Sequence, residues 1–170
     1  PIINVSGFMT KIGASITNLE SIKAAKEIFT NFVNIDELQA IASTRISKHL
    51  NAEAAVITAS AAAGLTESVA SMMTGNDLKK IFKLPNTNKM KNKVLIQKGH
   101  LTNYGAEIKQ GIELSGAKIL SCGLKDSCSI EQLEKSLSKN NKNIACAMYV
   151  VSHHCSEYNA VEISKFITFC

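Results

Sequence analysis

The feature that most constrains the fold is the alternation of short apolar runs with longer helical patterns. The runs 54–58, 94–97, 118–121 and 144–151 have the length of strands, and the stretches between them are long enough to form crossover helices. The run 144–151 is the most apolar, which predicts a central strand buried on both faces. The expected fold class is α/β, with a mostly parallel sheet and crossover helices.

Polar residues mark the predicted helix starts, because their side chains can accept hydrogen bonds from the first free N–H groups of a helix. The expected caps are Thr17 with Glu20, Asn34, Ser129 with Gln132, and Asn159 with Glu162. Further helices are predicted over residues 60–74 and near 106–114. We expect residues 1–50 to form an amino-terminal segment with helices, and residues 51–170 to form the first part of a cofactor-binding domain.

Composition narrows the class of protein. Apolar residues make up 45% of the 170 and charged residues 19%, values ordinary for a soluble globular domain. No apolar run has the length needed to cross a bilayer. The five cysteines are odd in number and include no Cys-x-x-Cys pair, which argues against a disulfide framework or a zinc knuckle. Free thiols in a reducing cytoplasm are expected.

Positive charge is concentrated in one segment. Residues 77–98 contain seven lysines, one acid (Asp77) and one aromatic residue (Phe82), whereas the whole chain has a net charge of +5. A solvated loop and an RNA-binding surface are both compatible with this pattern. RNA, including tRNA, is not favoured, because nucleic-acid modules interleave arginines and aromatic residues with their lysines.

In parallel α/β sheets, ligands bind beyond the carboxyl ends of the strands. At the first such point, the segment from Thr58 to Gly64 contains only hydroxyl and small residues. Small side chains let an anion approach the first N–H groups of a helix, so phosphate binding and a tightly packed helix start are both open readings. Neither a Walker loop nor a Gly-x-Gly-x-x-Gly pattern is present.

Two further strand ends carry histidines. His100 follows the run 94–97 and is a candidate to stack on a planar ligand or to transfer protons, although many loop histidines are simply exposed. His153 and His154 follow the run 144–151. Neighbouring residues of a strand face opposite sides, so this pair does not indicate a metal site.

Five segments, taken in order, resemble one family. They are Asn4-Val-Ser-Gly7 and the stretches 33–39, 53–64, 94–100 and 149–154. The chain is similar to the seryl-tRNA selenium transferase family of pyridoxal-phosphate enzymes, and is closer to the branch that includes D-glucosaminate-6-phosphate ammonia-lyase. This resemblance implies the large domain of a fold type I (aminotransferase-like) enzyme, pyridoxal 5'-phosphate (PLP) as cofactor, and a homodimer or larger homo-oligomer.

The resemblance also implies roles for residues that match the family's segments. Ser60, Ala61 and Ala62 match the loop that binds the cofactor phosphate, and His100 matches the position whose side chain lies over the pyridine ring.

Two further pairs of residues receive roles in the same way. Ser152 and His154 fall near the cofactor's phenolic oxygen, and Asn4 and Ser6 match the segment that lines the substrate pocket.

The family's remaining catalytic groups have no match in this chain. The resemblance implies that the Schiff-base lysine and the aspartate that pairs with the pyridine nitrogen lie downstream of residue 170. Pro1 and Cys170 accordingly look like the edges of a fragment. No catalytic residue is expected in residues 1–170, and the fragment alone is expected to be inactive.

The implied reaction is removal of an α-proton from an amino-acid-like substrate, followed by β-elimination. An ammonia-lyase outcome is favoured over selenium transfer, since Arg45 is the only arginine and no arginine-rich tRNA surface exists. The alternatives are a cysteine desulfurase or class V aminotransferase of the same fold, and a noncatalytic dimerisation or RNA-binding remnant. The expected location is the cytoplasm.

Overall fold

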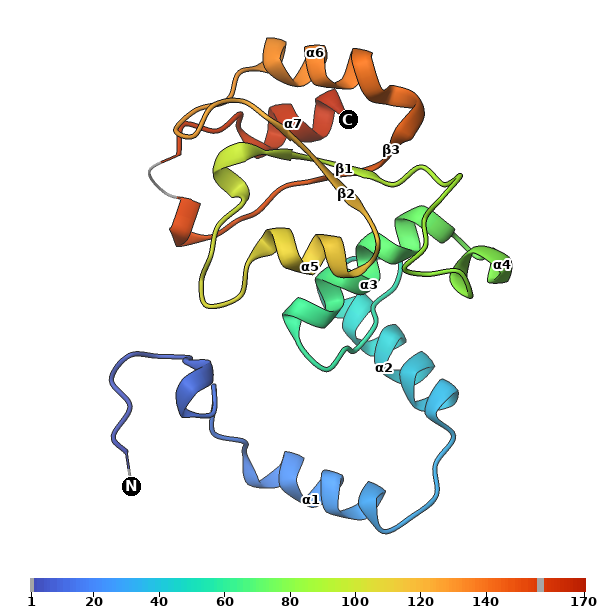
Figure 1. Ribbon diagram of the computed structural model, residues 1–170. Coiled ribbons are helices and arrows are strands. Elements are labelled where there is room, and N and C mark those ends of the chain that lie inside the picture. The colour runs from blue at the N-terminus through green and yellow to red at the C-terminus, as the bar shows by residue number, and fades with distance from the viewer. Residues whose placement is uncertain (1, 156–157) are drawn as a thin grey trace. The chain divides into compact units, whose positions relative to one another are not determined.

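The computed structural model describes residues 2–155 and 158–170 and divides them into two compact units, one ending at Ile57 and the other beginning at Thr58 (Figure 1). The earlier unit contains a short 3₁₀ helix and the helices α1 (Leu19–Phe29) and α2 (Ile35–Leu50). The later unit contains a sheet with helices on both faces. The predicted boundary between an amino-terminal segment (residues 1–50) and a cofactor-binding domain (residues 51–170) stays a prediction.

The sheet of the later unit is parallel, with strand order β2-β1-β3. Its strands are β1 (Lys93–Gln97), β2 (Lys118–Cys122) and β3 (Ile144–Met148). The prediction of a parallel α/β sheet is therefore confirmed. Among residues 2–155 and 158–170, β1 and not β3 is the inner strand, so the prediction that residues 144–151 form the central strand is not met within the described sheet.

Burial follows this order. Four of the five residues of β1 are buried, whereas all five residues of β3 are only half-buried. A strand is shielded on both sides only when neighbours pair with both of its edges, and β1 alone has two partners among residues 2–155 and 158–170. Apolar character alone did not distinguish these positions.

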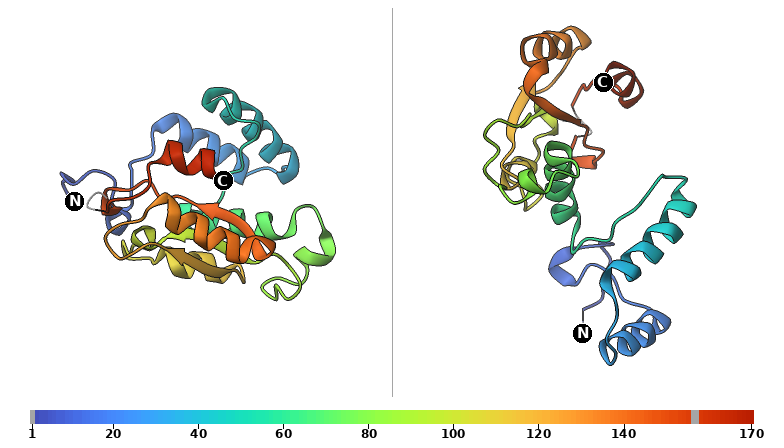
Figure 2. Two further views of the ribbon diagram at one scale, coloured as in Figure 1. Left: turned by 90° about the horizontal axis from the view of Figure 1, so that it is seen from above. Right: turned by 90° about the vertical axis from the view of Figure 1, so that its right-hand side faces the viewer.

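Helices cover the two faces of the sheet (Figures 1 and 2). One face packs against α3 (Ala61–Thr74) and α5 (Ile108–Leu114), and the other against α6 (Ile130–Asn140) and α7 (Ile163–Phe169). Successive residues of a strand point to opposite faces.

Val94 and Ile96 accordingly join the first core, with Val69 of α3 and Ile112 of α5. Leu95 joins the second core, with Leu133 of α6 and Phe166 of α7.

Two of the four predicted caps are where the sequence indicates. The Asn34 side chain accepts hydrogen bonds from the N–H groups of Asp36 and Glu37, and Ser129 forms a reciprocal capping box with Gln132. The prediction for the first helix was one residue early. Asn18, not Thr17, caps α1 by accepting from the Ser21 N–H group, since an asparagine side chain caps a helix at least as well as a threonine.

The prediction for the last helix was also wrong in detail. Glu162 occupies the cap position of α7 without a side-chain bond, and the backbone of Asn159 is paired with the 126–128 segment.

The predicted strand 54–58 is absent from the described sheet. Within the earlier unit, residues 52–57 run outside regular structure, and Val56 is 70% exposed. Side chains of α2 replace a neighbouring strand as hydrogen-bond partners. Gln39 both donates to the Ile57 carbonyl and accepts from the Ile57 N–H group, at 2.9 and 3.2 Å, and Ser43 Oγ accepts from the Ala55 N–H group. These bonds satisfy backbone groups that a sheet would otherwise pair.

The segment between α3 and β1 includes a single helical turn, α4 (Leu78–Ile81). Among the helices of residues 2–155 and 158–170, none combines the length and apolar character that a membrane crossing requires.

Candidate functional site

Two loops of the later unit meet at the carboxyl edge of the sheet. β1 and β3 are parallel neighbours, with Ile96 opposite Met148, so the chain leaves both strands at the same edge. The loop after β1 carries His100 and Tyr104, and the loop after β3 carries Ser152 and His154. This edge is where parallel sheets hold ligands.

The start of α3 presents free hydrogen-bond donors. Ser60 caps the helix by accepting from the Ala63 N–H group at 3.1 Å, and the first backbone bond of the helix runs from the Gly64 N–H group to the Ser60 carbonyl. The N–H groups of Ala61 and Ala62 precede that bond and therefore have no intrahelical acceptor. Both alanines are exposed. An anion can approach these donors and the positive end of the helix dipole without a steric barrier from large side chains.

His100 is packed into the protein. It is only 1% exposed, and its Nδ1 atom accepts a hydrogen bond from the Val150 N–H group at 3.3 Å. The rings of Tyr149 and Tyr158 contact it edge-on, with centroids at 4.4 and 5.6 Å. A planar ligand could stack on His100 only if one of these tyrosines moved. The predicted role of His100 over a pyridine ring stays a prediction.

Burial also determines the charge of His100. Loss of hydration lowers the pKa of its imidazole below the ordinary value of 6.5, because the charged form is disfavoured. The neutral ring accepts at Nδ1 and therefore carries its proton on Nε2. His100 thus connects the loop after β1 to the loop after β3 as a neutral hydrogen-bond acceptor.

A close backbone approach explains Gly99. A Cβ atom at this position would overlap the ring of Tyr158, so the tyrosine can lie against the loop only because residue 99 has no side chain. Tyr158, packed over residue 99, and Tyr149 both lie against the buried ring of His100.

Ser152 and His154 lie together at the end of the β3 loop. Ser152 Oγ accepts a hydrogen bond from the His154 N–H group at 3.3 Å, at the start of the 3₁₀ turn His153–Cys155. The rings of His153 and His154 are 4.0 Å apart. Neither histidine is buried. Among the described residues there is no cluster of histidine, cysteine and acidic side chains that could hold a metal ion.

Tyr104 contacts both the loop after β3 and the groove beside α3, although the sequence predictions gave it no role. Its ring lies nearly parallel to that of His154, with an interplanar angle of 19° and centroids 6.1 Å apart. It also lines a groove of about 330 Å³ together with Ala62 and Ala63 at the start of α3. The sequence signal for this residue was its place after a strand and in an Asn-Tyr-Gly turn.

Asn4 and Ser6 belong to the earlier unit and form a local turn. The Asn4 side chain donates to the Gly7 carbonyl and accepts from the Ser6 N–H group. Both residues are exposed. Their predicted role in a substrate pocket stays a prediction.

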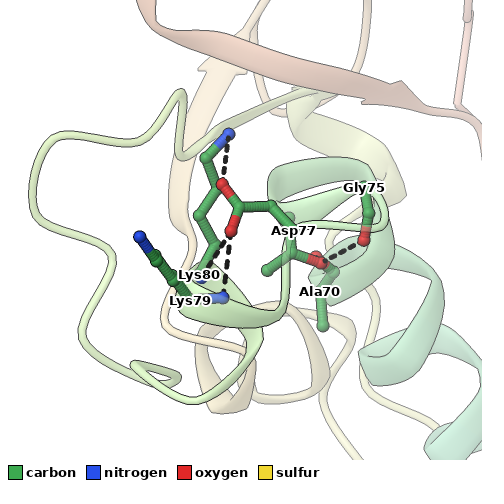
Figure 3. Close-up of polar contacts among 6 residues, drawn as sticks. Ala70, Gly75, Asp77, Lys79 and Lys80 are labelled. Atoms are coloured by element: carbon green, nitrogen blue, oxygen red, sulfur yellow. Dashed lines mark hydrogen bonds and ion pairs between the residues drawn. The ribbon is translucent and has the colours of Figure 1, made fainter.

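Asp77, the one acidic residue of the lysine-rich segment 77–98, has a structural role. The Asp77 carboxylate caps α4 by accepting from the N–H groups of Lys79 and Lys80, and it lies 4.0 Å from the Lys80 ammonium group (Figure 3). Thr74 Oγ1 closes the preceding helix by donating to the carbonyls of Ala70 and Gly75. These bonds explain the turn at residues 74–80 without a bound partner.

Comparison with known proteins gives two similar curated sequences and a similar solved structure. The chain is 32% identical over 166 residues to D-glucosaminate-6-phosphate ammonia lyase of Salmonella typhimurium, which covers 98% of the chain and 44% of the relative. It is 23% identical to a 5'-C-glycyluridine monooxygenase-decarboxylase of a Streptomyces species, covering 98% of the chain and 42% of that relative. No protein-family profile matches the chain.

A solved structure of D-glucosaminate-6-phosphate ammonia-lyase matches 96% of the chain and 43% of its own length, with a TM-score of 0.89 and 32% identity. The chain is therefore homologous to part of this ammonia-lyase, and its α/β fold matches part of that enzyme's structure. It spans less than half the length of the curated relatives that it matches. Both relatives are enzymes, one of them a lyase.

Proposed function

We propose that the complete protein is a PLP-dependent lyase that removes the α-proton of an amino-acid-like substrate and eliminates a β-substituent, with release of ammonia. The observation that supports this proposal most is the start of α3, where the exposed residues Ala61 and Ala62 carry N–H groups that have no intrahelical acceptor. The similarity to an ammonia-lyase supports the choice of a lyase over a transferase.

The donors at the start of α3 fit the phosphate of PLP. Ser60 supplies a hydroxyl group, and Ala61 and Ala62 supply backbone N–H groups at the positive end of a helix of 14 residues. These three residues would hold the phosphate. When bound, PLP withdraws electrons from the α-carbon of an amino substrate and so makes its proton removable.

The other residues of the proposed site would position the loops around the cofactor and the substrate. Neutral His100 holds the loop after β3 through the Val150 N–H group and adds no charge to the edge of the sheet. Ser152 and His154 would lie near the phenolic oxygen of the cofactor, and Asn4 and Ser6 would contribute to the substrate pocket. A homodimer or larger homo-oligomer in the cytoplasm belongs to the same proposal.

Binding of PLP to the complete protein tests the cofactor. We expect an absorbance band near the visible edge that borohydride abolishes, because a lysine of the complete protein holds the cofactor covalently. Ammonia release from candidate amino-acid substrates tests the reaction class. A protein that neither binds PLP nor develops this band would refute the proposal.

The Ser60→Asp variant tests the phosphate position. Aspartate caps a helix as well as serine does but repels a phosphate, so the helix should persist while the affinity for PLP falls about ten-fold or more. Asn34→Asp makes the equivalent cap exchange at α2 and should leave the affinity for PLP unchanged. Equal affinities for the two variants would argue against phosphate binding at α3.

A further inference from the structure

Three apolar side chains form an exposed face on α4, the single helical turn between α3 and β1. Leu78, Ile81 and Phe82 are 64%, 40% and 84% exposed. They occupy positions i, i+3 and i+4, so they lie on the same side of the turn. Figure 1 shows α4 at the margin of the later unit. Large apolar side chains grouped on an exposed face are typical of a surface that contacts another molecule.

The loop that follows α4 is held against the protein. Leu84 packs against the core that contains Val94 and Ile96. Thr87 is buried, and its hydroxyl group donates to the Gly116 carbonyl at 2.7 Å. The apolar face of α4 is therefore left exposed by a folded segment with contacts of its own.

Five exposed lysines flank this face in the sequence. They are Lys79, Lys80, Lys83, Lys89 and Lys91. Within residues 2–155 and 158–170, only Lys80 of these five lies within 4.0 Å of a carboxylate, that of Asp77 (Figure 3). The segment therefore places a net positive charge next to an exposed apolar face.

Apolar and cationic groups side by side match the surface of an anionic lipid bilayer. Anionic headgroups attract the lysines, while apolar side chains enter the boundary between the headgroups and the acyl chains. A nucleic acid would pair with the lysines, but its phosphate backbone offers no apolar partner to Leu78 and Ile81. A second copy of the same face would bring like charges together.

We propose that the face of Leu78, Ile81 and Phe82, together with the five lysines that flank it, binds the surface of anionic lipid bilayers. The contact is peripheral, because α4 has only 4 residues and can lie on a bilayer but not cross it. The cytoplasmic leaflet of a cell membrane carries the required negative charge. The proposal is independent of PLP and of the proposed reaction.

The test measures how much of the complete protein sediments with sucrose-loaded vesicles. The vesicles contain phosphatidylcholine alone or an equal mixture of phosphatidylcholine and phosphatidylglycerol. We expect binding to the mixed vesicles that weakens as the salt concentration rises, and little binding to phosphatidylcholine alone.

Two double variants separate the contributions of charge and apolar contact. Lys89→Gln with Lys91→Gln should weaken binding to the mixed vesicles about ten-fold or more, because each lysine near an anionic surface contributes a factor of about five. Ile81→Ser with Phe82→Ser keeps every charge and should also weaken binding about ten-fold or more, because it removes the side chains that enter the bilayer.

The loop after β2 provides the control. Leu124 is 58% exposed and is followed by the exposed Lys125. Leu124→Ser with Lys125→Gln should leave binding to vesicles unchanged. All the substituted side chains are exposed, so the melting temperatures of the variants should match that of the wild type.

A fluorescence measurement reports the contact directly. Residues 1–170 contain no tryptophan, so Phe82→Trp adds one to the face. On mixed vesicles, its emission should shift to shorter wavelength and be quenched by brominated lipids, relative to the wild type. Leu124→Trp should show neither change.

Several results would overturn the proposal. Equal binding to the two kinds of vesicle would exclude recognition of anionic lipid. Unchanged binding of the Ile81→Ser, Phe82→Ser variant would exclude the apolar face. Absence of binding to vesicles would mean that another partner or another part of the complete protein covers the face, and binding to a nucleic-acid duplex in that case would identify the lysines as its contact.

Discussion

The two units of the chain have similar helical patterns but very different burial. α1 and α2 carry apolar residues at helical intervals, as the helices of the later unit do, yet neither contains a buried residue. α3, α5, α6 and α7 all contribute buried side chains to one of two cores. The difference is the sheet, which gives the later helices a common apolar surface. An apolar stripe predicts a helix and its face, but burial requires a partner for that face.

The largest expected effect is a contrast between two leucine-to-alanine changes. Leu95 lies in β1 and is fully buried, whereas Leu50 ends α2 and is 70% exposed. Leu95→Ala should reduce the free energy of unfolding by about 2–5 kcal/mol, because it leaves a cavity in the core. Leu50→Ala should change it by less than about 0.5 kcal/mol. Urea denaturation of the complete protein measures both.

A large effect of Leu50→Ala would break the comparison. It would mean that α2 is covered in the assembled protein, as the proposed homo-oligomer allows, and a change in sedimentation or light-scattering mass would identify that cover.

A smaller effect is expected at the helix caps. Asn34→Ala and Ser129→Ala each remove a side-chain acceptor from the first turn of a helix, at a cost of about 1 kcal/mol. The two substitutions should affect hydrogen exchange differently. Hydrogen exchange should quicken locally in α2, which has no buried residues, whereas α6 is tied to the core through Leu133 and should share the loss with global unfolding. Identical exchange patterns would contradict the distinction between the units.

The pH dependence of stability tests whether His100 contributes to the core as a neutral side chain. Burial lowers the pKa of His100 in the folded protein, so protonation favours the unfolded chain. The contribution of neutral His100 to stability is fully present above pH 6.5 and is lost as the pH falls from 6.5 toward the lowered pKa. The melting temperature should therefore decrease as the pH is lowered from 7.5 to 5.

His49 lies in the exposed part of α2 and serves as the control. His49→Gln should retain the decline in stability, and His100→Gln should flatten it in this range. A decline that persisted unchanged in His100→Gln would assign the effect to another group.

The smallest effect is expected at an exposed ion pair. Lys80 lies 4.0 Å from the Asp77 carboxylate, and about half of each side chain is exposed. Lys80→Gln should change the free energy of unfolding by less than about 0.5 kcal/mol, because solvent screens the pair. Asp77→Ala should cost more, since it also removes the cap of α4. Equal effects would show that the cap contributes nothing.

The sequence by itself determined the local elements of this protein. Residues 94–97 and 118–121 predicted two strands, and Ser60, Asn34 and Ser129 predicted helix starts, because strand alternation and cap chemistry depend only on residues close in the chain. The expectation that the α3 start follows a strand of the sheet rested on the predicted strand 54–58, which the described sheet does not contain.

Only the tertiary structure decided which elements are central, and which aromatic ring at the sheet edge is accessible. β1 rather than β3 is the inner strand of the described sheet, and residues 54–57 bond to α2 side chains instead of joining it. The rings of Tyr149 and Tyr158 lie against His100, while Tyr104 remains exposed. These outcomes depend on contacts between residues far apart in the chain, which no local pattern contains.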